Sequence, residues 1–264
     1  MDLKLKDKIA FISGSTAGIG FAIAKRLLDE GARVIINGRT KETVDKSVQE
    51  LKTSVPGSGI SGIPADFSKV EEVNQLLKDL PEVDILINNA GIFEPLPFAE
   101  IPDEDWFRLF EVNVMSGIRL SRQYFPMMLK KNWGRVIFIS SESAVFIPDE
   151  MIHYGMTKTA QIAISRGLAE LTKGTQVTVN TILPGPTKSK GSKAFIQDLS
   201  KAGNISENEV EQNFFKNNRP TSLLQRFASV EEIADTVAYF VSPLASATNG
   251  AAIRVEGGLI RSIL

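Results

Sequence analysis

Short apolar runs rich in β-branched residues alternate along the chain with longer stretches of helical periodicity. Seven runs predict strands, namely Ile9–Ser13, Arg33–Asn37, Gly59–Ala65, Ile85–Asn88, Arg135–Ser140, Val177–Ile182 and Ala251–Val255. After the first run, Ile19, Ile23 and Leu27 share one helical face, and a glycine then ends the helix. Because strands and helices alternate, the connections must cross over, which predicts a mostly parallel sheet covered by helices on both faces. We therefore expect a single doubly wound α/β domain over residues 1–264.

The composition excludes several kinds of chemistry. The chain has no cysteine, so thiolate catalysis and zinc–thiolate sites are excluded, and with His153 as the only histidine we expect no metal site. The 30 basic and 31 acidic side chains give no electrostatic reason to expect nucleic acid or a membrane surface as a partner. No apolar run reaches the length of a membrane span, and Met1–Lys8 does not resemble a signal peptide. We expect a cytoplasmic enzyme.

The alternation of strands and helices stops between Lys188 and Gln225, where polar residues are interspersed with Phe195, Ile196, Leu199, Val210, Phe214 and Phe215. One interpretation is a surface excursion of one or two helices that pack these apolar residues inward. The other is a lid over a binding site, because long insertions at the end of a sheet often cover ligands. We favour a lid over residues 188–225.

A glycine-rich turn follows the first predicted strand and leads directly into a helix. Glycines allow a tight turn and let backbone N–H groups approach a pyrophosphate, while the helix N-terminus adds partial positive charge. Glycine clusters occur in many loops, but this place between first strand and first helix favours dinucleotide binding. The candidate cofactor residues of this turn are Gly14, Ser15, Thr16, Gly18, Ile19 and Gly20.

The end of the second predicted strand indicates which dinucleotide binds. The residues there are Asn37-Gly38-Arg39-Thr40-Lys41, with no carboxylate to repel a 2′-phosphate and with Arg39 able to donate to one. A charge-assisted hydrogen bond contributes about 1.5–3 kcal/mol. That is a preference of about one to two orders of magnitude. The sequence thus predicts NADP(H) rather than NAD(H), the alternative being that Arg39 is a solvated loop residue.

Ser141, Tyr154 and Lys158 form a second constellation. Tyr154 follows Ser141 by thirteen residues, and Lys158 follows Tyr154 by four, which places ammonium and phenol on one helical face. A tyrosine pKa of about 10 must fall by roughly three units, or about 4 kcal/mol, for efficient proton exchange at neutral pH. One cation at ~4 Å in an effective dielectric of about 20 supplies that order of stabilisation. Ser141 can hydrogen-bond the substrate oxygen.

Taken together, these features resemble the short-chain dehydrogenase/reductase family along nearly the whole chain. The resemblance covers the spacing Gly14-x-x-x-Gly18-x-Gly20 and the positions of Ser141, Tyr154 and Lys158. It adds Asn113 as the family asparagine that holds a water in the proton relay. The resemblance implies a Rossmann-type fold and hydride transfer between NADP(H) and an alcohol or carbonyl carbon. Tyr154 would act as general acid or base, Ser141 would position the carbonyl, and Lys158 would bind the nicotinamide ribose.

The same resemblance extends to further segments at the carboxyl ends of strands. Asn88-Asn89-Ala90-Gly91 matches the motif on the adenosine side, and Asp66-Phe67 matches the pair that flanks the adenine. Pro184-Gly185-Pro186-Thr187 matches the segment beside the nicotinamide amide. Besides Arg39 and the glycine turn, the resemblance therefore implies as cofactor residues Asp66, Phe67, Asn89, Ala90, Gly91, Tyr154, Lys158, Pro184, Gly185 and Thr187.

Two residues near Tyr154 depart from the family pattern or admit two interpretations. Glu142 stands where a smaller or neutral residue is usual, and we expect it to face solvent or a cationic group. His153 is either a second titrating group beside Tyr154 or a loop residue at the helix start that points away from the pocket; we favour the second. The predicted pocket lining is Phe93, Ser143, Val145, Phe146, Ile147, Pro186 and Phe195.

The expected substrate is therefore a small, partly apolar alcohol or carbonyl compound. A nucleotide-sugar epimerase is disfavoured by the glycine spacing and by the absence of a further substrate-binding region near the C-terminus. The alternative is a non-catalytic, NAD(P)-binding regulatory protein on the same fold. The resemblance also implies a homotetramer or homodimer formed through long helices near Asp103–Lys130 and Tyr154–Lys173.

Overall fold

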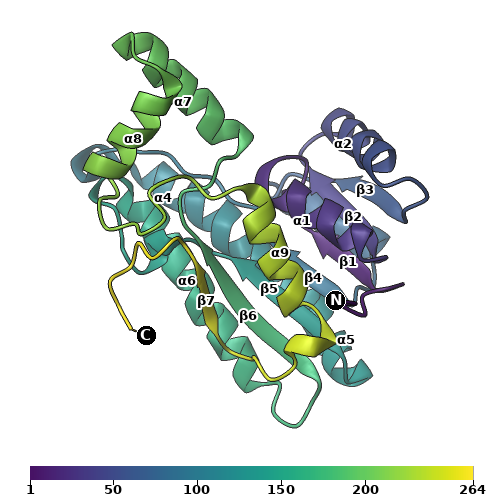
Figure 1. Cartoon of the computed structure of the whole chain (residues 1–264). Helices are drawn as coiled ribbons and strands as arrows, with labels where there is room; N and C mark the ends of the chain where they lie inside the picture. Colours follow the sequence, from purple (N-terminus) through teal and green to yellow (C-terminus); the bar gives the residue numbers. More distant parts are fainter. Residues whose placement is uncertain (264) are drawn as a thin grey trace.

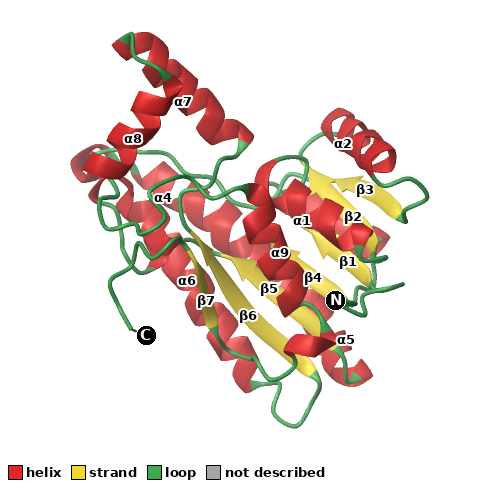
Figure 2. Ribbon diagram, viewed as in Figure 1, coloured by secondary structure: helices red, strands yellow, loops and turns green. Residues whose placement is uncertain are grey.

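The computed structural model describes residues 1–263, apart from the side chains at positions 190, 191, 194, 195, 199 and 202. Within this range one seven-stranded sheet has the order β3-β2-β1-β4-β5-β6-β7, and each neighbouring pair is parallel (Figure 2). The strands are β1 Ile9–Ile12, β2 Arg33–Gly38, β3 Ile60–Pro64, β4 Ile85–Asn88, β5 Gly134–Ile139, β6 Val177–Pro184 and β7 Ala252–Val255. The predicted Rossmann-type fold is confirmed, with strand ends that differ by one or two residues.

Helices cover both faces of this sheet (Figure 1). Adjacent strand residues point to opposite faces, so Ile12 packs in one core with α1 and α9, while Phe11 packs in another with α3 and α5. The helices are α1 Gly18–Asp29, α2 Lys41–Ser54, α3 Val70–Asp79, α4 Asp103–Phe110, α5 Ser116–Lys131, α6 Ile152–Glu170, α7 Lys190–Gly203, α8 Glu207–Asn217 and α9 Val230–Phe240. Of these, none within residues 1–263 is long and apolar enough to cross a membrane.

The helix predicted over Asp103–Lys130 is not continuous. α4 ends at Phe110, a π-helical turn occupies Glu111–Met115, and α5 begins at Ser116. π-helical turns of this kind are frequent at functional sites because they shift the side chains of one turn relative to the next. Here the turn contains Asn113, and its side chain is buried.

Residues 188–225 contain α7 and α8, which project together from the body of the molecule (Figure 1). Both helices begin with a serine capping box, at Ser189 and Ser206. Apolar residues of this segment pack inward, as in the interpretation of a surface excursion, and Ile196, Val210 and Phe215 join Phe227 in a small core of their own. Phe195 and Leu199 belong to the same apolar set, but their side chains lie outside the described part of the chain.

Asn37 connects three strands at the carboxyl edge of the sheet. Its Oδ1 accepts a hydrogen bond from the Gly14 N–H at 3.0 Å. Its Nδ2 donates to the carbonyls of Ile63 and Ala65, each at 3.2 Å. Asn37 is 1% exposed and its bond to Ala65 is buried, so removal of the amide would leave that carbonyl without this partner and break the other two bonds. The amide therefore fixes the glycine-rich turn relative to the ends of β2 and β3.

We predict that Asn37→Ala lowers the free energy of unfolding by about 2–3 kcal/mol, because it leaves buried donors and acceptors unsatisfied. Urea denaturation followed by circular dichroism measures the change. The control is Asn74→Ala on the exposed face of α3, which should shift stability by no more than about 0.5 kcal/mol. Equal stabilities for the two variants would show that the Asn37 amide does not hold the turn.

Candidate active site

The glycine-rich turn has a shape that only glycine permits at three positions. Gly14 and Gly18 both have φ of +60°, in the left-handed region. A Cβ at Gly20 would lie 2.5 Å from the Asn89 Nδ2 and 2.9 Å from the Gly14 carbonyl oxygen. α1 begins after Ala17, which offers no capping side chain, and its first turn carries no acidic residue. The first N–H groups of α1 therefore remain available for an anion such as a pyrophosphate.

The Asn88–Gly91 segment is held tightly against this turn. Ser13 Oγ accepts the N–H groups of Asn89 and Ala90, both at 2.9 Å. Asn89 Nδ2 returns hydrogen bonds to the carbonyls of Ser13 and Gly14, at 3.0 and 2.8 Å. Ser15 is fully buried, and its hydroxyl donates to the Ile12 carbonyl, so its side chain shapes the turn from within. The turn and the end of β4 thus form one rigid edge.

Arg39 lies at the outer end of this edge. A Cβ at Gly38 would lie 2.5 Å from Thr16 Cγ2, so a glycine at this position lets the chain pass close to the turn. The next residue, Arg39, is exposed. Asp66 faces the same region: burial opposes its ionisation, but hydrogen bonds from Ser68 and the positive charges of Lys69 and Arg39 hold its pKa below the ordinary value. Phe67 is 5% exposed and packs in the core beneath α3 and α5.

Lys158 is anchored behind the pocket. Its Nζ donates to the Ile139 carbonyl at the end of β5 at 3.0 Å, and Ser140 Oγ donates to the Lys158 carbonyl at 2.8 Å. A Cβ at Gly91 would lie 3.3 Å from that Nζ, so the ammonium directly borders the Asn88–Gly91 segment. Burial lowers the pKa of Lys158 to about 8. The predicted catalytic lysine therefore lies where the β4 and β5 ends meet.

Tyr154 is four residues earlier on α6, and its ring centroid lies 5.6 Å from the Lys158 Nζ. The pKa of Tyr154 is raised above its ordinary value, first by burial and second by the Glu142 carboxylate, while a hydrogen bond with Ser141 acts in the opposite direction. This differs from the lowered pKa expected from the tyrosine–lysine spacing. The ammonium is itself desolvated and bonded elsewhere, and desolvation of the phenol outweighs its influence.

Asn113 and Gln161 connect the π-helical turn to Lys158. The Asn113 side chain exchanges two hydrogen bonds with the main chain of Ile92, at 2.7 and 2.9 Å, and donates a third to Thr157 Oγ1. Its main-chain carbonyl accepts from Gln161 Nε2 at 2.6 Å, and Gln161 Oε1 accepts from Lys158 Nζ at 3.3 Å. Sequence reasoning missed Gln161, although its position three residues after Lys158, on the same helical face, could have indicated it.

Ser141 and Tyr154 open onto a cavity of about 820 Å³. Of the predicted lining, Phe93, Ser143 and Pro186 are in its wall. The prediction is wrong for Val145, Phe146 and Ile147, because after the short turn at Glu142–Ala144 they lie on the surface, 47–55% exposed. The Phe195 side chain lies outside the described residues. Residues 188–225 contribute lining that sequence reasoning did not identify, including Ile205, Val210, Asn213, Phe214, Asn217 and Arg219.

Pro184 is the last residue of β6, and Gly185 and Thr187 after it line the cavity. A Cβ at Gly185 would lie 2.7 Å from the Glu256 Cα, so the β6 end passes directly against the end of β7. Thr187 Oγ1 donates to the Gly185 carbonyl at 2.8 Å, and Thr187 forms an isolated bridge with Ala228. These contacts fix where residues 188–225 leave the sheet.

Glu142 is 6% exposed, and its Oε2 accepts from Ser141 Oγ at 2.5 Å. Of the two expected surroundings, solvent or a cation, the structure shows the cation: Arg219 Nε lies 3.7 Å from Oε1.

His153 was expected in a loop, which is wrong because α6 begins at Ile152 and His153 is fully buried in its first turn. Its ring packs edge-on against Trp106 at 5.7 Å, and burial lowers its pKa. It is not part of the described cavity wall.

The buried lysine has a measurable consequence for stability. The pKa of Lys158 is about 8 in the folded chain and 10.5 in its ordinary state, so the unfolded chain binds more protons between these values. The free energy of unfolding should therefore rise with pH across this window.

We predict that the free energy of unfolding of the wild type, relative to Lys158→Met, rises by about 3 kcal/mol from below pH 8 to above pH 10.5. Urea titrations at several pH values measure this, with the exposed Lys173→Met as control; a flat difference would contradict it.

The comparisons with known proteins agree with this geometry. Residues 8–200 match the family model for short chain dehydrogenases. The chain is 51% identical over 263 residues to the uncharacterized oxidoreductase YvaG of Bacillus subtilis (strain 168), with 100% of both chains covered. It is 34% identical over 260 residues to dehydrogenase/reductase SDR family member 4 of Caenorhabditis elegans, covering 97% and 96% of the two chains.

Solved structures extend the similarity to the whole fold. The L-sorbose reductase of Gluconobacter frateurii, complexed with NADPH and L-sorbose, superimposes with a TM-score of 0.93 at 28% identity and 100% coverage of both chains. An actinorhodin polyketide ketoreductase variant with NADPH gives a TM-score of 0.85 at 28% identity, covering 97% and 98%. The chain belongs to the short-chain dehydrogenase/reductase family of oxidoreductases.

Proposed function

We propose that this oxidoreductase transfers a hydride between NADP(H) and the alcohol or carbonyl carbon of a small, partly apolar substrate, with Tyr154 as general acid or base. The observation that carries the proposal is the position of Tyr154. Its ring lies in the cavity wall beside Ser141, while Lys158 lies between it and the Asn88–Gly91 edge. A substrate in the cavity and a cofactor on the edge would meet at this phenol.

The cofactor fit is supported by the rigid edge at the carboxyl ends of β1, β2 and β4. The uncapped start of α1 suits a pyrophosphate, and the exposed Arg39 suits a 2′-phosphate. The structural relatives with NADPH agree with this choice over NAD(H). Of the residues predicted to bind the cofactor, Ser15 and Phe67 would act by supporting the edge from within. No group of His, Asp or Glu in residues 1–263 could hold a metal ion.

The chemistry that the cofactor supplies is the hydride. For reduction, the raised pKa of Tyr154 keeps the phenol protonated at neutral pH, which is the form that can donate to a carbonyl oxygen. Ser141 would turn its hydroxyl proton from Glu142 to the same oxygen and stabilise its developing charge. The protonated form of Lys158, with its pKa near 8, would stabilise the tyrosinate that the donation leaves behind.

Asn113 and Gln161 would position this lysine rather than contact substrate. The Gln161 amide bridges the Lys158 ammonium and the Asn113 carbonyl, which keeps the ammonium near the phenol. A carbonyl oxygen has a second lone pair, so the Asn113 carbonyl could also accept from a water of the proton relay. The intact set of Asn113, Ser141, Tyr154 and Lys158 favours an enzyme over the alternative of a regulatory NAD(P)-binding protein.

A homodimer or homotetramer remains part of the proposal. α4 exposes Phe107 at 73% and Phe110 at 38%, and α5 exposes Met127 at 41%. Exposed large apolar side chains on helices, such as the pair Phe107 and Phe110, are typical of surfaces that become covered by a partner. A second copy of the chain is the partner that the family resemblance implies.

We predict that Tyr154→Phe lowers kcat for NADPH-dependent reduction of carbonyl compounds by about 10²–10⁴-fold, since it removes the proton donor and little volume. NADPH oxidation at 340 nm with a panel of ketones, oxo acids and ketoses measures the rate. Tyr239→Phe on the exposed side of α9 should leave it unchanged. Undiminished activity of Tyr154→Phe would rule out the assigned role, and no turnover by the wild type on the whole panel would favour the regulatory alternative.

A further inference from the structure

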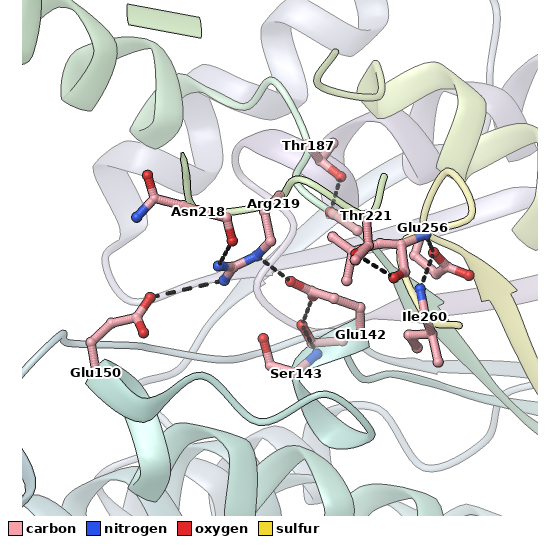
Figure 3. Close-up of polar contacts among 12 residues, drawn as sticks. Glu142, Ser143, Glu150, Thr187, Asn218, Arg219, Thr221, Glu256 and Ile260 are labelled. Carbon is pink, nitrogen blue, oxygen red and sulfur yellow. Dashed lines mark hydrogen bonds and ion pairs between the residues drawn. The ribbon is translucent and has the colours of Figure 1, made fainter. Parts of the chain in front are cut away.

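Arg219 lies in the cavity wall just after α8 and is 8% exposed (Figure 3). A guanidinium has five N–H donors. The one hydrogen bond that Arg219 makes within the described residues runs from Nη1 to the carbonyl of its neighbour Asn218, at 2.8 Å. Its Nε is fully buried and donates no hydrogen bond to any described residue. The cavity therefore contains a buried cation with most of its donors unused.

The carboxylates nearest to Arg219 do not satisfy these donors. Glu142 Oε1 is 3.7 Å from Nε, and Glu150 Oε1 is 3.9 Å from Nη2, both beyond hydrogen-bond distance. Glu142 is committed on its other oxygen to Ser141, and burial raises its pKa although the charge of Arg219 acts in the opposite direction. Glu150 is 44% exposed and shares its charge with solvent. Neither acid forms a close pair with the guanidinium.

Buried N–H donors without acceptors are costly, so a ligand that supplies acceptors gains binding free energy. The planar fork of arginine matches a carboxylate, which can accept two parallel N–H bonds. Besides the two glutamates, the wall here has apolar side chains: Phe214 lies 5.8 Å from the guanidinium, and Val210 and Phe227 line the same cavity. The chemistry of this corner thus fits an anionic head with an apolar chain.

The contacts of Glu142 also indicate how far this corner is from the reacting group. One Glu142 oxygen accepts from Ser141 and the other faces Arg219, so a single carboxyl group spans the gap between them. Ser141 is the residue proposed to hold the substrate carbonyl. A substrate that spans the same gap would have its carboxylate only one or two carbons from its carbonyl.

Building on the proposed function, we propose that Arg219 binds the substrate carboxylate and that the substrate is a 2-oxo or 3-oxo acid with an apolar chain, or the corresponding hydroxy acid. Arg219 is then a specificity-determining residue supplied by the lid segment. Glu142, which contacts both Ser141 and Arg219, orients the two groups between which the acid lies.

The test compares 2-oxohexanoate and 3-oxohexanoate with their neutral amides, which have nearly the same shape. Isothermal titration calorimetry measures binding to the wild type, Arg219→Met, Arg219→Lys and the control Arg122→Met on the exposed side of α5, with NADPH binding as the check that each variant is folded. We expect at least one acid to bind the wild type tenfold or more tightly than its amide. Arg219→Met should abolish that difference without changing the amide affinity, Arg219→Lys should keep part of it, and Arg122→Met should keep all of it.

Equal affinities of acid and amide for the wild type, or no measurable binding of either acid at millimolar concentration, would overturn the proposal. So would an Arg219→Met variant that weakens acid and amide equally, because Arg219 would then serve only as the counterion of Glu142. The reduction assay separates the two proposals. An acid that binds through Arg219 but is not reduced with NADPH contradicts the proposed function, whereas reduction of the amide without preference for the acid contradicts this inference.

Discussion

The Asn37 amide holds the carboxyl edge of the sheet together, and the candidate site is built on that edge. It joins the turn after β1 to the end of β3 from its own place in β2. Ser13 makes the corresponding connection between the turn and the end of β4. Parallel strands bring their carboxyl ends to one side of the sheet, but only such cross-links fix loops of different strands relative to one another. The edge is therefore rigid before any ligand binds.

The other half of the site depends on the burial of polar groups next to this edge. Lys158 is bonded to the β5 end and Gln161, and Glu142 is buried between Ser141 and Arg219. Burial pushes the pKa of the lysine down and those of Tyr154 and Glu142 up, so each group is held closer to its neutral form. A protonated phenol beside a partly charged lysine suits proton donation to a carbonyl oxygen.

The strands could be predicted from the sequence because buried parallel strands consist of continuous apolar runs, which differ from the helical periodicity around them. The glycine turn and the Tyr154–Lys158 spacing are local patterns, so they could be predicted too. Gln161 and Asn37 could not be identified as readily, since a single buried amide has no pattern until its distant partners are known. Arg219 lies in a segment without periodicity, and only the chain reversal after α8 brings it beside Glu142.

The expected lowering of the Tyr154 pKa illustrates a different limit. Spacing along a helix predicts that Lys158 is near the phenol, and the structure places it 5.6 Å from the ring centroid. Spacing contains no information on desolvation, nor on the carboxylate that Glu142 brings from another element, and these two causes raise the pKa instead. The π-helical turn at Glu111–Met115, which interrupts the predicted helix, could not be predicted for a similar reason. Asn113 in this turn bonds to Ile92 and Thr157, which are distant in the sequence.

We propose that the edge organised by Asn37 binds NADP(H), with Arg39 selecting the 2′-phosphate. A fluorescence titration of wild type and Arg39→Ala with NADPH and NADH tests it most directly. The wild type should bind NADPH at least about tenfold more tightly than NADH, and Arg39→Ala should lose that preference while binding NADH as before. Equal binding of the two cofactors by the wild type would contradict the selection by Arg39, and binding of neither would contradict the cofactor site itself.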